Sequence, residues 1–340
     1  MDEQNDEDWL GDMGLNPQLN LALRKEVLYF VTQGILKSLD KAQELAFAVS
    51  QGYGSDSGRR VNSFVNSLHA LSDLTKGIQG EQIAFISHDY SFSLDDHHSF
   101  KDRMPLLFRR LRELSGISEP WYAQQIAIPT QEKLAEGASG AFMFFCGAGE
   151  FMVKTISATE SETLISILKT YVAHLEQNPK SLLVRFIGLH ELNMYNQTFY
   201  FVVMKNIFPS VSVINQRYDI KGSWINRSAS GSMPPGTKTF CKHCGDFFRI
   251  GSSGKCHQRV GSHEPNLILK DNDLTSKIRM KPDEAFQVID ILNRDSDALC
   301  AMGITDYSLL VGIRNVSYEV EPDIVYGKRY FLSCYIDINS

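Results

Sequence analysis

Two apolar runs near the C-terminal end constrain this sequence most, because each one carries an aspartate. The first run follows Asp306 within residues 303–313, and the second run, 330–338, contains Asp337 near its end. The turn-rich segment 321–327 between them predicts an antiparallel hairpin. The start of one strand then lies beside the end of the other, about 5–8 Å from aspartate to aspartate. Such a carboxylate pair suits metal binding and hydroxyl activation in phosphoryl transfer, whereas two solvated strand-end aspartates are the alternative.

Composition indicates a globular protein with a real core. The chain has 340 residues, of which 43% are apolar, enough for one large or two ordinary domains. The net charge of −6 argues against a dedicated nucleic-acid-binding protein. The apolar stretch 27–36 is too short to cross a bilayer, there is no signal peptide, and the six cysteines are unevenly spaced. We therefore expect a cytoplasmic protein without a disulfide framework.

The N-terminal part predicts helices and no chemistry. Residues 1–14 are acidic and are expected to be a disordered tail. Apolar residues at steps of three and four predict helices over 15–50 and 61–78, in a helical region that extends to residue 94.

A basic segment follows this region. Pro105 fits the start of a helix with an apolar face. The basic side chains are Lys101, Arg103, Arg109, Arg110 and Arg112. They form either a solvated helix face or a surface attracted to an anionic membrane, at about 1 kcal/mol for each basic residue near the surface.

Small residues precede an apolar strand that contains a lysine. Gly137, Ser139 and Gly140 allow the backbone to lie close over an anion. Lys154, within the strand 151–156, is costly to bury unless it faces an anionic group such as a nucleotide phosphate. In the next predicted helix, 159–175, Glu160 and Glu162 serve either as partners of Lys154 or as helix-capping and solvated carboxylates.

The following region predicts a pair of strands and a loop. Residues 182–189 and 199–204 read as paired strands, and the chain leaves the sheet over 205–208. Lys221 lies in a later loop, beside Gly222 and Ser223. Residues 282–300 predict a helix that leads to Asp306.

An insertion at 238–266 has metal-ligand spacing. The Cys241–Cys244 pair would hold two thiolates within about 4 Å of a tetrahedral zinc, and Cys256 and His263 would complete the shell. His257 is the competing imidazole. Because the loop has few apolar groups, a structural zinc would supply folding free energy. Free thiols in a loose insertion are the alternative.

Several strings resemble the phosphatidylinositol phosphate kinases, a lipid kinase family distantly related to protein kinases. ITDYSLLVGI is similar to the family signature MDYSLLVGI, and RYDIKGS is similar to RYDLKGS. GASGAFMFF…FMVKT resembles GxSGSFFYF…FIIKT, and YFVVMKNIF resembles YFVVMNNVF. LKDNDL matches LKDxDF, and residues 99–117 resemble the family's entry into the kinase domain, with Arg103 in place of an aromatic residue.

The resemblance implies a fold and a reaction. The fold would be α+β, of the two-lobed type shared with protein kinases and SAICAR synthase, with an antiparallel N-lobe sheet over 95–205 and a C-lobe over 206–340. The reaction would be transfer of the ATP γ-phosphoryl group to a phosphatidylinositol monophosphate on the cytosolic face of anionic membranes. Homodimerisation is a further expectation from the resemblance.

The resemblance also implies roles for single residues. Asp306 takes the catalytic position, and Asp337 takes the position that binds Mg²⁺. Gly137, Ser139, Gly140 and Lys154 would hold ATP phosphates, and Lys221 would reach a phosphate of nucleotide or lipid. The adenine would lie against Val203, Met204 and Asn206.

One departure from the family pattern affects activity. The sequence stops at Ser340, shortly after Asp337, whereas the family continues into a basic activation segment. This indicates either a shortened chain or a catalytically weak or inactive phosphoinositide-binding scaffold with a kinase-like fold. A soluble protein kinase is disfavoured because the sequence has no HRD or DFG string.

Overall fold

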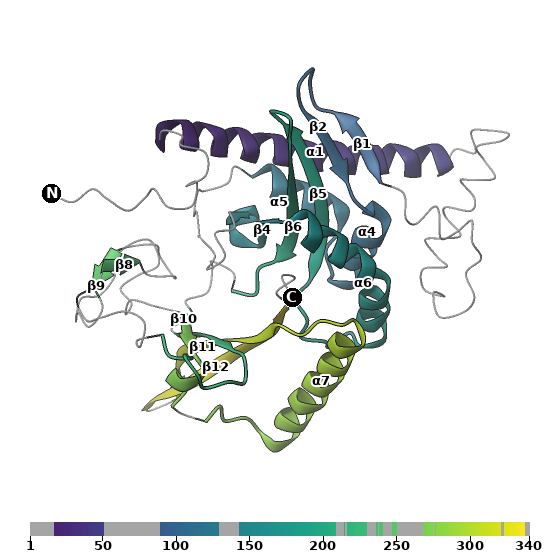
Figure 1. The fold of residues 1–340 in the computed structure, drawn as a ribbon. Helices are drawn as coiled ribbons and strands as arrows, with labels where there is room; N and C mark the ends of the chain where they lie inside the picture. The colour runs from purple at the N-terminus through teal and green to yellow at the C-terminus, as the bar shows by residue number, and fades with distance from the viewer. Residues whose placement is uncertain are drawn as a thin grey trace. The chain divides into compact units, whose positions relative to one another are not determined.

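The computed structural model describes residues 17–50, 89–128, 143–208, 214, 216–229, 236, 238–240, 247–249, 268–275, 277–320 and 323–336. It divides into two units (Figure 1). The N-terminal unit comprises Met1–Gln177 and Arg185–Lys205, and the C-terminal unit comprises Asn178–Val184 and Asn206–Ser340. The fold is a mixed α+β structure.

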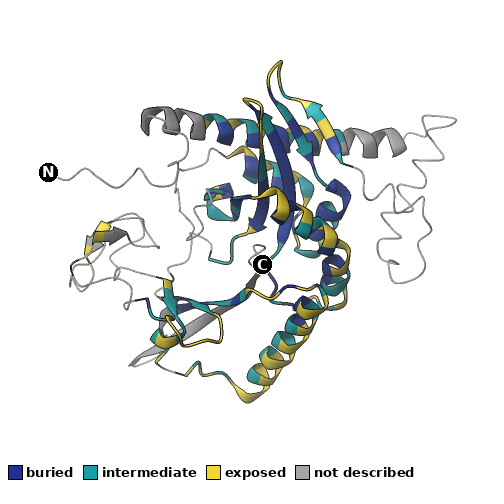
Figure 2. Ribbon diagram, in the orientation of Figure 1, coloured by how far each residue is buried: buried dark blue, intermediate teal, exposed yellow. Residues whose placement is uncertain are grey.

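The N-terminal unit is built on a six-stranded antiparallel sheet (Figure 1). Its strands, in spatial order, are β1 (Tyr90–Ser93), β2 (Ser99–Asp102), β5 (Phe186–Met194), β6 (Gln197–Lys205), β4 (Phe151–Ile156) and β3 (Met143–Cys146). Eight of the nine residues of β5 are buried, seven of them consecutively from Phe186 to Leu192, so this central strand is covered on both faces (Figure 2).

The predicted strand 182–189 begins later than expected. Its first residues are excluded from β5 because the backbone N–H of Leu182 donates to Asp295 Oδ2 at 2.7 Å. That donor is therefore satisfied by a side chain and not by a neighbouring strand.

Four helices lie in the described residues of this unit. They are α1 (Pro17–Ser50), α4 (Pro105–Leu114), α5 (Glu119–Ala127) and α6 (Ala158–Gln177). The helices predicted from 15, from 105 and over 159–175 are confirmed, α5 was not predicted, and the predicted helix 61–78 lies outside the described residues. Within the described part of the chain, no helix has an apolar stretch long enough to cross a bilayer.

Helix α1 is joined to the sheet by both apolar and polar contacts. Val31 and Ile35 are buried in the same core cluster as Phe100 of β2. The Ser38 hydroxyl donates to Asp102 Oδ2, and His190 Nδ1 lies 3.0 Å from Asp102 Oδ1. All three side chains are buried, so the Ser38–Asp102 hydrogen bond satisfies groups that water does not reach, and the Asp102 carboxylate lies beside the imidazole of His190.

The C-terminal unit contains a four-stranded sheet and a long helix (Figure 1). The strands lie in the order β10 (Ile268–Lys270), β7 (Gln216–Ile220), β11 (Tyr307–Val320) and β12 (Asp323–Ile336). β10 pairs parallel with β7, and the other neighbours are antiparallel. The helix α7 (Pro282–Ala301) confirms the prediction over 282–300. The short strands β8 (Lys238–Phe240) and β9 (Phe247–Arg249) form a separate ribbon.

The predicted C-terminal hairpin is present. β11 and β12 pair antiparallel from Tyr307↔Ile336 to Val320↔Asp323. The predicted turn over 321–327 was too long, because β12 already begins at Asp323 and Gly327 pairs with Val316. The two strands are thus longer than the turn-forming residues indicated, because apolar residues continue to alternate beyond the predicted strand ends.

Candidate functional site

Asp306 lies at one end of the β11–β12 hairpin, next to the pair that Tyr307 forms with Ile336. The last described pair is Tyr307↔Ile336, so Asp306 directly precedes the paired region. Asp337 directly follows Ile336 and lies outside the described residues. The register of the described pairs agrees with the antiparallel hairpin that the sequence predicts.

Lys221 reaches Asp306 from the neighbouring strand. Leu309 of β11 pairs with Ile220, the last residue of β7, so the loop after β7 leaves the sheet beside Asp306. Lys221 Nζ donates to Asp306 Oδ1 at 2.5 Å. The side chains are 30% and 50% exposed, so this ion pair contributes about 1 kcal/mol at most. The structure therefore brings together two of the predicted site residues.

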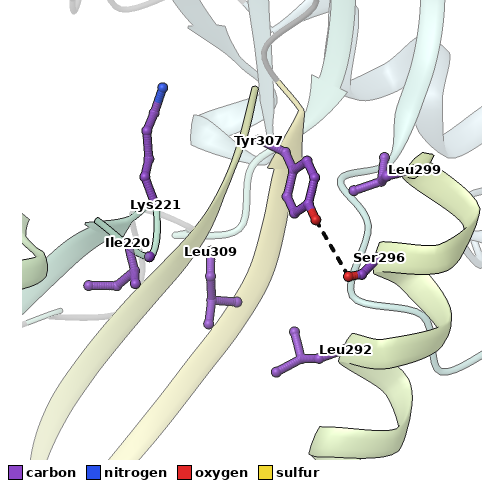
Figure 3. Close-up of a pocket in the computed structure, with 8 residues that line it drawn as sticks. Ile220, Lys221, Leu292, Ser296, Leu299, Tyr307 and Leu309 are labelled. Atoms are coloured by element: carbon purple, nitrogen blue, oxygen red, sulfur yellow. Dashed lines mark hydrogen bonds between the residues drawn. The ribbon is translucent and has the colours of Figure 1, made fainter. Parts of the chain in front are cut away.

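A pocket of about 230 Å³ adjoins this pair. It lies between the β7–β11 strands and α7 (Figure 3). Its lining residues are Ile220, Lys221, Gly222, Leu292, Ser296, Leu299, Tyr307 and Leu309. The Tyr307 and Ser296 hydroxyls lie 3.5 Å apart, and the lysine amine points away from the leucines. The pocket therefore has an apolar wall with a cation at one edge.

Asp271 fixes the loop that carries Lys221. Its Oδ1 accepts hydrogen bonds from the backbone N–H groups of Lys221, at 3.0 Å, and Gly222, at 2.8 Å. Its Oδ2 accepts from Arg227 Nε at 2.7 Å. Burial opposes ionisation of this carboxyl, but the hydrogen bonds from Arg227 and Gly222 outweigh it and lower the pKa of Asp271. The ionised Asp271 side chain therefore holds the start of the loop, at Lys221 and Gly222, and its end, at Arg227.

The following residues continue this attachment. Asp273 Oδ2 accepts from the backbone N–H groups of Ala229, at 2.7 Å, and Lys270, at 2.9 Å. The sequence analysis used residues 269–274 only as a string similar to the family. It did not predict that Arg227 and Asp271 hold the loop. The available signal was an arginine shortly after Lys221 together with two aspartates, Asp271 and Asp273, close together in the sequence.

Lys154 lies in the N-terminal unit, in β4. It is 6% exposed and pairs in register with Val202 on one side and Met143 on the other. Met143 begins β3, which directly follows the predicted phosphate-binding segment. Gly137, Ser139 and Gly140 themselves lie outside the described residues. Lys154 thus lies one strand away from the start of β3, and its role in holding ATP phosphates stays a prediction.

Glu160 and Glu162 have other partners. Glu160 Oε2 accepts from the backbone N–H of Ser157 at 2.5 Å, and Ser157 Oγ accepts from the backbone N–H of Glu160 at 3.1 Å. This is a reciprocal cap at Ser157, two residues before the predicted helix start at Thr159. Glu162 accepts from Arg103 at 3.0 Å. The capping interpretation is therefore confirmed for Glu160.

Val203 and Met204 are core residues of β6, with exposed fractions of 0% and 1%. The strand ends at Lys205, one residue later than predicted. Beyond it, Asn206 Nδ2 donates to the Phe208 carbonyl and Asn206 Oδ1 accepts from the Phe208 N–H, both at 3.0 Å. Only the part after Lys205 leaves the sheet and presents polar backbone groups.

The basic segment is not a free cationic surface. Each of its basic side chains has a carboxylate partner: Lys101 with Glu191, Arg103 with Asp89, Glu162 and Glu191, Arg109 with Glu113, Arg110 with Glu113 and Glu176, and Arg112 with Glu119. Arg112 is also buried. The structure therefore corrects the membrane interpretation of this segment, because acidic residues from other elements neutralise it.

Comparison with known proteins establishes the family. The family model described as Phosphatidylinositol-4-phosphate 5-Kinase matches residues 127–328, which is more than half of the chain. The chain belongs to this family. The match includes Lys154, Lys221 and Asp306 and ends within β12.

Individual relatives support the same family. A probable phosphatidylinositol phosphate kinase of Dictyostelium discoideum is 32% identical over 66% of this chain and 29% of its own length. A phosphatidylinositol 4-phosphate 5-kinase of Schizosaccharomyces pombe is 30% identical over 64% of this chain and 26% of its own length. The human type-1 alpha enzyme is 30% identical over 71% and 40%. The aligned part thus spans well under half of these relatives.

The zinc prediction falls outside the described residues, as do its ligands Cys241, Cys244, Cys256 and His263 and the competing His257. Within the described residues, no group of His, Cys, Asp and Glu is arranged to hold a metal ion. The ribbon of β8 and β9 brackets the CxxC string, because β8 ends at Phe240 and β9 begins at Phe247. Zinc binding stays a prediction.

Proposed function

We propose that this chain transfers the γ-phosphoryl group of ATP to an inositol-ring hydroxyl of a phosphatidylinositol monophosphate, giving a bisphosphate. The observation that carries the proposal is the Lys221–Asp306 pair at the end of the β11–β12 hairpin. It lies within the segment matched by the lipid kinase family. The antiparallel sheet and the family membership also support a kinase-like arrangement of two lobes.

The chemistry assigns a role to each partner. The hydroxyl oxygen forms a bond to the γ-phosphorus while the bond from that phosphorus to the bridging oxygen of ADP breaks. Asp306 orients the hydroxyl and accepts its proton. Lys221 exchanges its contact with Asp306 for a phosphate of the substrates, which a half-exposed ion pair permits.

The remaining roles concern the nucleotide. Lys154 holds its phosphates together with Gly137, Ser139 and Gly140, and Asn206 and the backbone beyond β6 contact the adenine. Asp337 holds Mg²⁺, which neutralises charge on the phosphates when it is bound. The register of the hairpin, with Tyr307 opposite Ile336, supports the placing of this carboxylate near Asp306.

The test is labelled-phosphate transfer from ATP to liposomes that carry each phosphatidylinositol monophosphate in turn. We expect Asp306→Asn to lower turnover by about a hundredfold or more while nucleotide affinity is unchanged, because the variant loses the proton acceptor. Asp297→Asn, an exposed aspartate of α7, is the matched control and should be fully active.

Two results would contradict the proposal. Full turnover in Asp306→Asn would remove this residue from catalysis. No transfer by the unaltered chain to any of the lipids, with no binding of Mg-ATP, would make it a phosphoinositide-binding scaffold.

A further inference from the structure

Two large apolar side chains stand exposed at the tip of the loop after β7. Trp224 is 76% exposed and Ile225 is 72% exposed, and they are adjacent in sequence. They follow Lys221 by three and four residues. Exposed single apolar residues are ordinary, but a neighbouring tryptophan and isoleucine at a loop tip beside a candidate site are a specific feature.

This loop tip is held in place. The Trp224 carbonyl accepts from Asn272 Nδ2 at 2.8 Å, and the Arg227 carbonyl accepts from the Asn272 N–H at 2.9 Å. Gly222 and Asn226 have φ values of 76° and 57°, which bend the chain on either side of the apolar pair. With the backbone fixed in this way, the two side chains are presented to solvent and not folded back.

An exposed basic stretch follows the turn that holds this loop. Lys277, Arg279 and Lys281 are exposed, and none of their charged groups has an ion-pair partner among the residues that the structure describes. They alternate with Ile278, which packs against the core cluster of Tyr218, Val311 and Ile313. The packed isoleucine anchors the stretch, so its three cations are directed outward.

We propose that Trp224 and Ile225 insert into the interface of a lipid bilayer, and that Lys277, Arg279 and Lys281 bind its anionic surface. Tryptophan prefers the boundary between headgroups and acyl chains, because its ring is apolar and its N–H is polar. The lipid substrate rests on the function proposed above. With the loop so inserted, Lys221 and Asp306 lie close to the headgroups.

The size of the apolar pair favours a bilayer over a protein partner. A stable protein interface buries about 1,200–2,000 Å², far more than two side chains supply. Insertion into lipid needs only a few apolar side chains when basic residues add electrostatic attraction. This surface also differs from the basic segment 101–112, whose charges are paired.

The test measures binding of the full chain, without ATP, to vesicles of phosphatidylcholine and phosphatidylserine. We expect Trp224→Ala/Ile225→Ala to weaken binding about tenfold or more. Replacement of Lys277, Arg279 and Lys281 by Gln should weaken it about a hundredfold at low salt and much less at high salt. The matched control is Phe286→Ala/Ile289→Ala, which removes two exposed apolar residues of α7 and should bind like the unaltered chain.

A spectroscopic readout reports insertion directly. In a Trp9→Phe/Trp121→Phe background Trp224 is the remaining tryptophan of the chain. We expect its emission to shift to shorter wavelength on vesicles and to be quenched by lipids with brominated acyl chains. Unchanged emission, or unchanged binding of the Trp224→Ala/Ile225→Ala variant, would overturn the inference.

Other outcomes separate this inference from the proposed function. Vesicle binding that depends on Trp224, with no phosphate transfer, would leave the membrane contact and remove the catalytic proposal. Phosphate transfer, together with vesicle binding that the Trp224 and Ile225 changes do not weaken, would support the catalytic proposal and remove the membrane contact. Self-association of the chain that the same changes abolish, without vesicles, would assign this surface to a second copy and overturn the inference.

Discussion

The carboxylate of Asp271 determines the conformation of the loop that carries Lys221. It accepts two backbone N–H groups and an arginine N–H, and its side chain is 12% exposed. Hydrogen bonds to a charged and partly buried acceptor are among the stronger ones in proteins. A change at this residue should therefore affect both stability and the candidate site.

We expect Asp271→Asn to lower the free energy of unfolding by about 1–2 kcal/mol at neutral pH, because the amide keeps the shape but loses the charge. The lowered pKa of Asp271 sets the pH dependence: its contribution is present above the ordinary carboxyl range and is lost as the pH falls through its folded value. The difference between the variant and the unaltered chain should therefore shrink on acidification. Denaturant unfolding at a series of pH values measures it.

Asp219→Asn is the control for this comparison. Asp219 Oδ1 lies 3.6 Å from Arg227, beyond hydrogen-bond distance, so its replacement should cost less. Equal losses in the two variants, or a difference that grows in acid, would contradict the role given to Asp271.

The sequence predicted some of these residues and not others, for a physical reason. Asp306 could be predicted as a site residue because it directly precedes an apolar run that is typical of a β-strand. The position of a strand determines where the residue at its end lies. The contact between Arg227 and Asp271 joins residues 44 positions apart. It follows no helical or strand period, so only the folded chain reveals it.

The docking of α1 onto the sheet depends on a close approach at Gly34. A Cβ added at Gly34 would lie 2.2 Å from Phe100 Cδ2, whereas neighbouring α1 positions such as Gln33 are exposed. The glycine is therefore required by packing and not by its backbone angles.

We expect Gly34→Ala to weaken the docking of α1 although alanine favours the helix itself by about 1 kcal/mol. Hydrogen exchange should become faster in α1 and in β2, and the unfolding midpoint should fall. Gln33→Ala, with the same helix former at an exposed position, should leave both unchanged. Slower exchange in Gly34→Ala would show that the helix is not packed as described.

Helices and hairpins were predictable from their apolar periods, since each period is local. The partners of the basic segment were not, because Glu191, Glu162 and Glu176 come from other elements. The start of β5 was also missed, since the N–H of Leu182 is taken by a side chain of α7. Local sequence patterns therefore indicate whether an element is a helix or a strand. Residues distant in the sequence determine where the element ends and whether its charged side chains are paired.

For the molecule as a whole, zinc in the insertion 238–266 is a separate expectation. We expect elemental analysis of the purified chain to find equimolar zinc, lost in Cys241→Ser/Cys244→Ser and retained in Cys300→Ser, which changes an exposed cysteine outside the insertion. Protease cleavage within 238–266 should rise when zinc is removed. A chain free of zinc after purification without chelators would refute this prediction.

The contact between Asp102, Ser38 and His190 affects where this protein could be divided. The family match begins at residue 127, yet β2 pairs with β5 through Phe100↔Leu192, and Asp102 partners His190. A fragment trimmed to the matched segment would leave the edge of β5 open and a buried histidine without its carboxylate. The segment that the family model matches is therefore shorter than the part of the chain that folds as one unit.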